Sequence, residues 1–176
     1  MKKATLVILA LAMLLPMAAM AQSSGTLAVT ATLQSSIFLT VENSTTGVTL
    51  TNAGTAAATM ALGNVSAFSG TVPTNVTKAL VGSPATAFTL STKFGVKVVQ
   101  ANAGASTTYS LSGSLASSDA NTWTVDGKVL TTTSQVLSTT GTYAAGIVDH
   151  PFVLSIPTSE AAGSISNTIN LVASAT

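Results

Sequence analysis

His150 is the residue best suited to acid–base chemistry, because it is the only histidine among the 176 residues of the chain. A hydrolase triad needs such a base beside a nucleophile, with a carboxylate to orient it. Asp149 directly precedes His150, but neighbouring residues of a strand point to opposite faces, so the two make a poor dyad. We expect His150 to be a turn residue before Pro151. The sequence also has no Gly-x-Ser-x-Gly nucleophile elbow.

The acidic residues offer little more chemistry. There are five: Glu42, Asp119, Asp126, Asp149 and Glu160. Most fall in predicted turns, so nothing indicates the facing pair of carboxylates that glycoside hydrolysis requires. One histidine, no cysteine and no acid-rich calcium loop give no basis for a metal site. We therefore predict no catalytic, cofactor or metal site, and a protein that is not an enzyme.

The small number of charged residues argues against nucleic acids and membrane surfaces as partners. Only 6% of the residues are charged and none is arginine, so the polar surface must come from Ser, Thr and Asn. Beyond residue 21, four lysines stand against the five acids, a net charge of −1: Lys78, Lys93, Lys97 and Lys128. Scattered lysines cannot neutralise the phosphates of a nucleic acid or form a basic membrane-binding face. We expect neither partner.

The first 21 residues have the pattern of a secretory signal peptide. Two lysines precede an apolar run, Ala4–Leu15, and residues 19–21 (Ala-Met-Ala) have the small–x–small form of a cleavage site. We expect cleavage before Gln22, export through the general secretory route, and a secreted or cell-surface location. Residues 22–176 are enough for a single domain, with no predicted membrane span.

Both ends of this domain alternate between apolar and polar residues, as half-buried strands do. Near its start, one face would carry Leu27, Val29, Ala31 and Leu33. Over Ser164–Ala173, one face would carry Ile165, Asn167, Ile169, Leu171 and Ala173. The chain therefore ends on a predicted strand that must pair with something.

Between these ends, short β-prone runs alternate with turn signals. Phe88–Gln100 alternates clearly, and Asp126-Gly127 predicts a tight hairpin because both residues tolerate positive φ. Trp123, the only tryptophan, is expected in the core beside this hairpin. The pattern predicts an all-β fold, an antiparallel β-sandwich of about 8–10 strands, with a closed barrel as the alternative architecture.

Three segments resemble the pilin-like families of bacterial surface proteins. Val29-Thr30-Ala31-Thr32 resembles their first strand, Leu62-Gly63-Asn64-Val65 an internal step, and Pro157–Leu171 their C-terminal segment. The layout is similar to the spore coat protein U group and the archaic chaperone–usher pilins. The chain departs from many of those pilins in having no cysteine near the first strand.

This resemblance implies a function as a structural subunit of a fimbrial filament or coat. Such pilins are immunoglobulin-like sandwiches that lack their last strand, and a strand from a neighbouring subunit fills the gap. Here the donor residues would be Leu27, Val29, Ala31 and Leu33, and the edge of the acceptor groove would be Ile165, Ile169 and Leu171. The implied partners are further copies or related subunits, with a periplasmic chaperone and an usher.

The second hypothesis is a self-complete secreted β-sandwich that acts in cell adhesion by binding a ligand such as a glycan. Few aromatic residues are available for a sugar platform: Tyr109, Trp123 and Tyr143. The position of Leu27–Leu33 separates the two hypotheses. Pairing within its own chain beside Ile165–Ala173 would favour the closed domain, whereas exposed core beside the last strand would favour the pilin-like subunit.

Overall fold

The computed structural model describes residues 27–32, 36–101 and 106–176. The chain divides into two units, Met1–Thr32 and Leu33–Thr176, and of the first unit only residues 27–32 are described. The predicted signal peptide, residues 1–21, and Leu33 of the predicted donor strand lie outside the described residues. Within the described residues, no helix has the length and apolar composition needed to cross a membrane.

The second unit is built from antiparallel strands, which confirms the all-β prediction. Its strands are β1 Ser36–Glu42, β2 Leu50–Thr51, β3 Thr59–Met60, β4 Asn64–Val65, β5 Gly70–Thr71, β6 Thr77–Val81, β7 Ala87–Ala101, β8 Thr108–Leu115, β9 Thr122–Val125, β10 Lys128–Val129, β11 Gln135–Thr142, β12 Ile147–Pro157 and β13 Ile169–Ala175. The only helical element among the described residues is a single 3₁₀ turn, Tyr143–Ala145.

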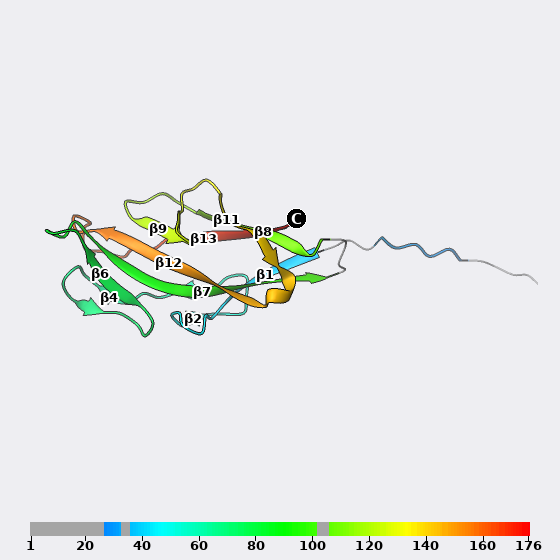
Figure 1. The fold of residues 1–176 in the computed structure, drawn as a ribbon, viewed down its shortest axis with the longest axis horizontal. Coiled ribbons are helices and arrows are strands. Elements are labelled where there is room, and N and C mark those ends of the chain that lie inside the picture. Colours follow the sequence, from blue (N-terminus) through cyan, green and yellow to red (C-terminus); the bar gives the residue numbers. More distant parts are fainter. Residues whose placement is uncertain (1–26, 33–35, 102–105) are drawn as a thin grey trace, which may run out of the picture. The chain divides into compact units, whose positions relative to one another are not determined.

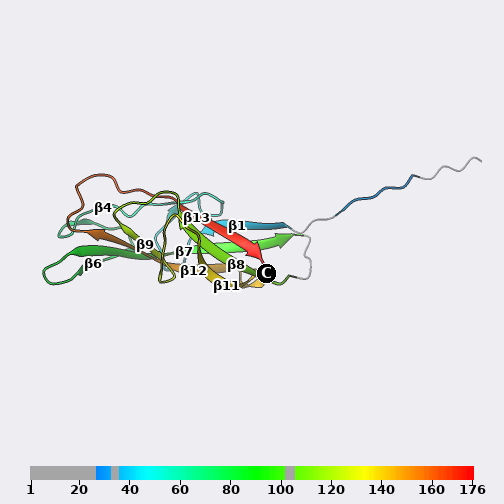
Figure 2. The ribbon, with the colours of Figure 1, turned by 90° about the horizontal axis from the view of Figure 1, so that it is seen from above.

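The larger sheet is centred on β7 and β12, whose long antiparallel ladder is visible in Figure 1. On its other edge β7 pairs with two strands, β6 along residues 87–91 and β1 along residues 95–101. The β9–β10 hairpin extends the opposite side of β12. A smaller sheet has the order β11-β8-β13, and Figure 2 shows β13 lying along β8.

The core forms where the inward faces of these strands meet. Along β7, Phe94, Val96 and Val98 are buried while Lys93 and Lys97 are exposed, as the alternation predicted. Buried side chains of β8 join the same apolar cluster: Tyr109, Leu111 and Leu115. Each such side chain contributes about 1.5–3 kcal/mol by leaving water, so this shared cluster supplies most of the driving force for folding.

The Asp126-Gly127 hairpin is confirmed. Asp126 has φ 51° and Gly127 has φ 73°, the left-handed pair that matches the twist of two antiparallel strands. Beside it, Trp123 is buried in β9, as expected of a core aromatic.

The predicted turn at His150 is wrong, because His150 lies inside β12 and is buried. Pro151 suggested a turn, yet it interrupts no hydrogen bond of the β9 ladder, since that ladder runs only from Phe152 onward. The Pro151 carbonyl instead accepts a hydrogen bond from the backbone N–H of Asp126 at 2.9 Å. A proline is tolerated where a ladder ends.

The C-terminal strand begins at Ile169, five residues later than the predicted start at Ser164. Its partner β8 ends at Leu115, and the last backbone bond before that strand runs from Ala116 N–H to the Thr168 carbonyl, at 2.9 Å. Beyond this point the partner chain turns away, so residues 164–168 have no ladder to join.

Residues 27–32 carry no strand, although the alternation predicted one over Leu27–Leu33. None of the strand pairs among the described residues includes them. Leu27 and Val29 are 87% and 82% exposed. These apolar side chains are therefore without the burial that their alternation predicts.

Candidate functional site: an open apolar groove beside the last strand

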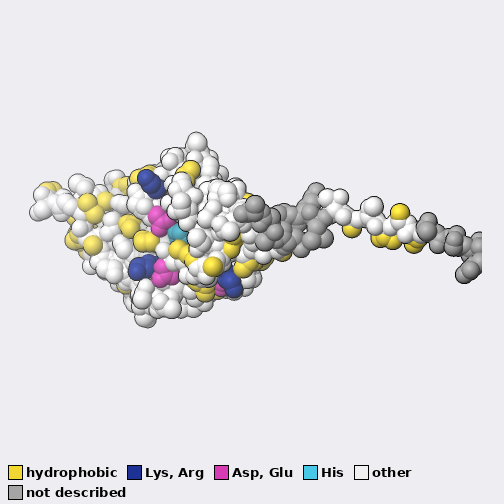
Figure 3. Space-filling view, turned by 45° about the vertical axis from the view of Figure 1, so that its right-hand side comes forward, with side chains coloured by type: hydrophobic (Ala, Val, Ile, Leu, Met, Phe, Trp, Pro, Cys, Tyr) yellow, Lys and Arg dark blue, Asp and Glu magenta, His cyan; other side chains and the backbone are white. Residues whose placement is uncertain are grey.

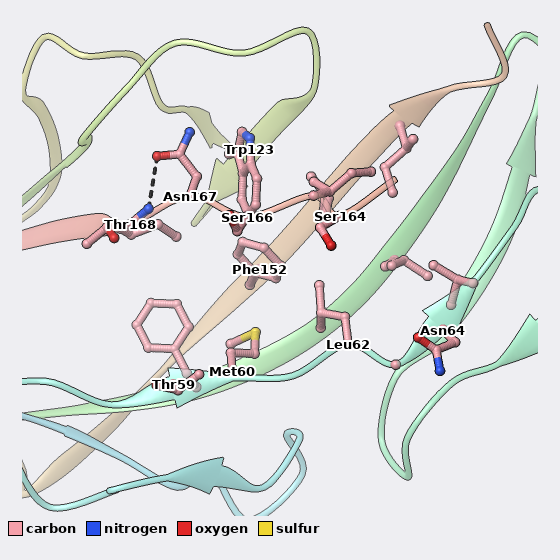
Figure 4. Close-up of a pocket in the computed structure, with 18 of the residues that line it drawn as sticks. Thr59, Met60, Leu62, Asn64, Trp123, Phe152, Ser164, Ser166, Asn167 and Thr168 are labelled. Carbon is pink, nitrogen blue, oxygen red and sulfur yellow. Dashed lines mark hydrogen bonds between the residues drawn. The ribbon is translucent and has the colours of Figure 1, made fainter. Parts of the chain in front are cut away.

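A groove of about 860 Å³ lies beside the C-terminal segment of the second unit. One wall is formed by residues 163–169 and Leu171, and the other by residues 58–60 and 62–66. Figure 4 shows Leu62 and Asn64 on one side, Ser164 and Asn167 on the other, with Phe152 between them.

The floor of the groove is the core itself. Side chains that are almost fully buried line it, from strands β7, β9 and β12: Phe88, Leu90, Phe94, Trp123, Phe152, Leu154 and Ile156. An apolar concavity of this kind can take up side chains in place of water. None of the residues that line it is charged. Figure 3, by contrast, shows basic and acidic side chains gathered near the histidine on the face that it draws.

The groove is open because β13 is paired along one edge only. That edge meets β8, and among the described residues no strand is hydrogen-bonded to the other edge. Strand β1 approaches β13 but shares no ladder with it. An unpaired edge presents backbone N–H and C=O groups that can bind a further strand.

The predicted acceptor residues all line this groove. Ile165, Ile169 and Leu171 are half-buried and pack against the core cluster. The residues directly next to them in the sequence are exposed. Asn167, midway between Ile165 and Ile169, is half-buried and shares their inward face. The alternation predicted for this segment is thus confirmed, while its role as an acceptor stays a prediction.

Asn167 fixes the part of the wall that has no ladder. Its Nδ2 donates to the Ser117 carbonyl at 2.7 Å and to Asp119 Oδ2 at 3.0 Å. Its Oδ1 accepts the backbone N–H of Thr168 at 2.9 Å, the contact drawn as a dashed line in Figure 4. One side chain therefore replaces the missing strand pairing.

Asp119 connects this wall to the floor. Its carboxylate accepts a hydrogen bond from Trp123 Nε1 at 2.9 Å, in addition to the bond from Asn167. Burial acts to raise the pKa of Asp119, but the hydrogen bonds from Trp123, Asn167 and Asn121 outweigh it and hold that pKa below its ordinary value. The carboxylate form is thus the one that the groove stabilises.

Sequence reasoning missed this role of Asp119 and placed it only in a turn. A signal was present, because Asp119 stands four residues before the only tryptophan. A buried indole N–H needs an acceptor, and a nearby carboxylate is the strongest one available.

Of the predicted donor residues, the structure describes Leu27, Val29 and Ala31, all exposed. They belong to the first unit, whereas the groove belongs to the second. Their function as a donor strand stays a prediction.

His150 has a carboxylate partner that the sequence did not reveal. Its Nδ1 lies 2.6 Å from Asp126 Oδ2, and its ring stacks on Phe94 with centroids 5.8 Å apart. Asp149 points the other way and accepts a bond from Ser44 Oγ at 2.8 Å, as expected for adjacent strand residues. Among the described residues His150 Nε2 has no hydrogen-bond partner.

The described residues also include no group of three or more acidic or histidine side chains placed to hold a metal ion. Comparison with known proteins adds no family. No protein-family model matches the sequence, and no curated protein matches it.

Proposed function

We propose that this protein is a non-catalytic structural subunit that assembles by β-strand complementation. In this proposal the second unit is an immunoglobulin-like, pilin-like sandwich that lacks one strand. The segment Leu27–Leu33 of one copy fills the groove of the next. The observation that carries the proposal is the apolar groove, open to the core, beside the unpaired edge of β13.

The lengths of donor and groove support this proposal. Seven extended residues, 27–33, span about 23 Å at 3.3 Å per residue. The C-terminal wall from Gly163 to Leu171 spans about 30 Å by the same measure. The donor segment therefore fits along the wall with little excess.

The side chains support an antiparallel arrangement, the only type of strand pairing among the described residues. Four inward positions on the donor would face four on the wall, as Leu27 with Leu171, Val29 with Ile169, Ala31 with Asn167 and Leu33 with Ile165. This register places the smallest donor side chain, Ala31, opposite the only polar position. A parallel arrangement would place Val29 there and Ala31 against Ile169.

Two contributions would favour assembly. Burying Leu27 and Val29 would contribute about 3–6 kcal/mol, before the entropic cost of association is subtracted. Each backbone hydrogen bond to the free edge of β13 would add about 1 kcal/mol. Because one copy donates to the next, the contact is head to tail and builds an open filament.

The same groove explains why partners are expected before assembly. An apolar groove beside a free strand edge is a site of aggregation. We therefore propose that a periplasmic chaperone covers it after export, that an usher guides assembly, and that the filament is displayed on the cell surface. The subunits that follow are copies of this chain or related proteins.

The alternative, a self-complete adhesin or glycan-binding module, has less support. Trp123 and Tyr109 are buried, so neither offers an exposed ring face for a sugar. A small hollow of about 310 Å³ is the place where a polar ligand would be sought. It is lined by Thr46 and Asn75 from loops, by Thr77 of β6, and by residues 91–93 of β7 and 151–153 of β12.

The test compares the protein expressed from its full sequence with a variant that lacks residues 22–33. We expect filaments of the first, by light scattering and electron microscopy, and a monomer of the second. That monomer should bind a peptide of residues 26–34, but not the same peptide carrying Val29→Asp. A full-length monomer whose deletion variant is unfolded would mean that the segment completes its own domain, and would overturn the proposal.

A further inference from the structure

Phe68 is a large apolar residue that the fold does not use. It lies in the turn of the β4–β5 hairpin and is 81% exposed. The turn around it is well fixed: Ser66 N–H donates to the Ser69 carbonyl at 3.0 Å, and Ser69 N–H donates to Ser66 Oγ at 3.0 Å. This turn therefore presents the Phe68 side chain to solvent in a fixed position.

Lys78 strengthens this arrangement from β6. Its Nζ donates to the carbonyls of Ser66 and Ser69, at 3.0 and 2.7 Å. These two bonds attach the hairpin turn to the larger sheet. The position of Phe68 is therefore set by the body of the domain.

This hairpin stands at one end of the groove. Ser66 and Ser69 line the groove on either side of Phe68 in the sequence. Figure 4 shows Asn64, the first residue of the hairpin, toward the same end as Ser164, whereas Thr59 and Thr168 lie toward the other end. A strand leaving the groove past Ile165 would thus pass close to Phe68.

A second exposed apolar pair lies near the start of β1. Phe38 and Val99 face each other across the β1–β7 ladder and are 57% and 40% exposed. They lie on the outer face of the sheet, because their neighbours Ile37 and Leu39 pack against the core. We call Phe38 and Val99 the β1 patch.

A short linker in the sequence would bring the β1 patch of one copy close to Phe68 of the next. Only Gln34 and Ser35 separate the donor segment from Ser36, the first residue of β1. Three residue steps reach at most about 11 Å. In the antiparallel register, Leu33 lies opposite Ile165, at the hairpin end of the groove. The start of β1 of one copy must then lie beside the hairpin of the next.

We propose that Phe68 of one copy packs on the β1 patch of the adjacent copy and fixes the angle between successive subunits. This proposal rests on the proposed function and its antiparallel register. The contact is too small to hold two free proteins together. It acts because the inserted strand keeps the two surfaces at a high effective concentration.

The absence of cysteine from the chain allows a direct test. We would make Phe68→Cys with Val99→Cys in one chain and treat its assemblies with a short bis-maleimide. The matched control is Phe68→Cys with Val129→Cys, because Val129 is similarly exposed but lies on β10. We expect a ladder of covalent oligomers on a denaturing gel from the first variant and none from the control.

The outcomes separate this contact from strand complementation. Filaments without the Phe68–Val99 ladder overturn the contact and leave strand complementation intact. No filaments and no uptake of the 26–34 peptide overturn both.

A second variant, Phe68→Ser, removes the side chain from a solvent-exposed position, so the fold and peptide uptake should be unchanged. We expect its filaments to have a shorter persistence length in electron micrographs. An unchanged persistence length would overturn the proposed contact.

Discussion

Trp123 Nε1 donates a hydrogen bond to Asp119 Oδ2 at 2.9 Å, and this bond joins the floor of the groove to its wall. The same carboxylate oxygen accepts Asn167 Nδ2 at 3.0 Å. Since residues 164–168 have no strand partner among the described residues, the shape of the groove at this end depends on Asp119. A single exposed acid therefore shapes the site.

Replacing this acid should weaken the fold. Asp119→Ala leaves the nearly buried Trp123 indole without its acceptor and frees Asn167, so we expect a loss of about 1–3 kcal/mol in the free energy of unfolding. Chemical denaturation followed by tryptophan fluorescence measures it. Glu160→Ala, at another exposed acid, is the matched control and should be nearly neutral. Equal losses in the two variants would contradict the role assigned to Asp119.

Acid should weaken the same contact. The hydrogen bonds hold the pKa of Asp119 below its usual 3.8 in the folded protein, so the unfolded chain binds the proton more readily. The stability gained from Asp119 is complete above the unfolded-state pKa and is lost as the pH falls through the lower, folded-state value. We expect the difference in urea midpoint between the wild type and Asp119→Asn to shrink as the pH is lowered below 3.8. A difference that stays constant would count against this account.

Much of the fold could be predicted because its signals are local. Alternation along β7 and at the C-terminus, and the Asp126-Gly127 pair, depend on residues close together in the sequence. The period of two fixes which side chains face the core without any knowledge of the strand's partner. For the same reason, the spacing of Ile165, Ile169 and Leu171 predicts that they share one face, whereas their assignment to a groove edge came from the resemblance to pilins.

The partners of side chains far apart in the sequence could not be predicted. His150 meets Asp126, 24 residues away, only because β12 pairs with β9. The start of β13 was misplaced because alternation continues through residues 164–168, whereas pairing stops where β8 ends. The alternation of residues predicts which face a side chain lies on. Where the strand pairing ends depends on the length of the neighbouring strand.

The Asp126–His150 pair gives a prediction about stability. Asp126→Ala removes the partner of a buried histidine and places alanine at φ 51°, so we expect a loss of about 2–4 kcal/mol. Asp126→Asn keeps an oxygen acceptor and tolerates this φ, so its loss should be clearly smaller. Thermal unfolding of the two variants side by side makes the comparison. If the asparagine variant loses as much stability as the alanine variant, the carboxylate charge, which both variants lack, matters more than the hydrogen bond.

Close packing at Tyr109 gives another prediction. A Cβ at Gly141 would overlap the ring of Tyr109, which is buried and packs against Tyr143 with ring centroids 5.4 Å apart. We expect Gly141→Ala to cost about 1–3 kcal/mol of stability through this overpacking. Gly163→Ala is the control, since nothing lies within 4 Å of a Cβ there. If both variants unfold at the same denaturant concentration, the packing of β11 on β8 is wrong.

The two faces of β13 give the sharpest test of the groove. Ile169 lies on the groove face and Val172 on the opposite, exposed face of the same strand. Ile169→Asp should lower the affinity for the 26–34 peptide by roughly 100-fold, because it places an unpaired charge where an apolar side chain must be buried. Val172→Asp introduces the same charge three residues away and should bind normally. Fluorescence anisotropy of a labelled peptide, measured on the variant lacking residues 22–33, gives both affinities, and the fluorescence of Trp123 shows whether each domain is folded. Equal affinities in two folded variants would mean that the peptide binds elsewhere.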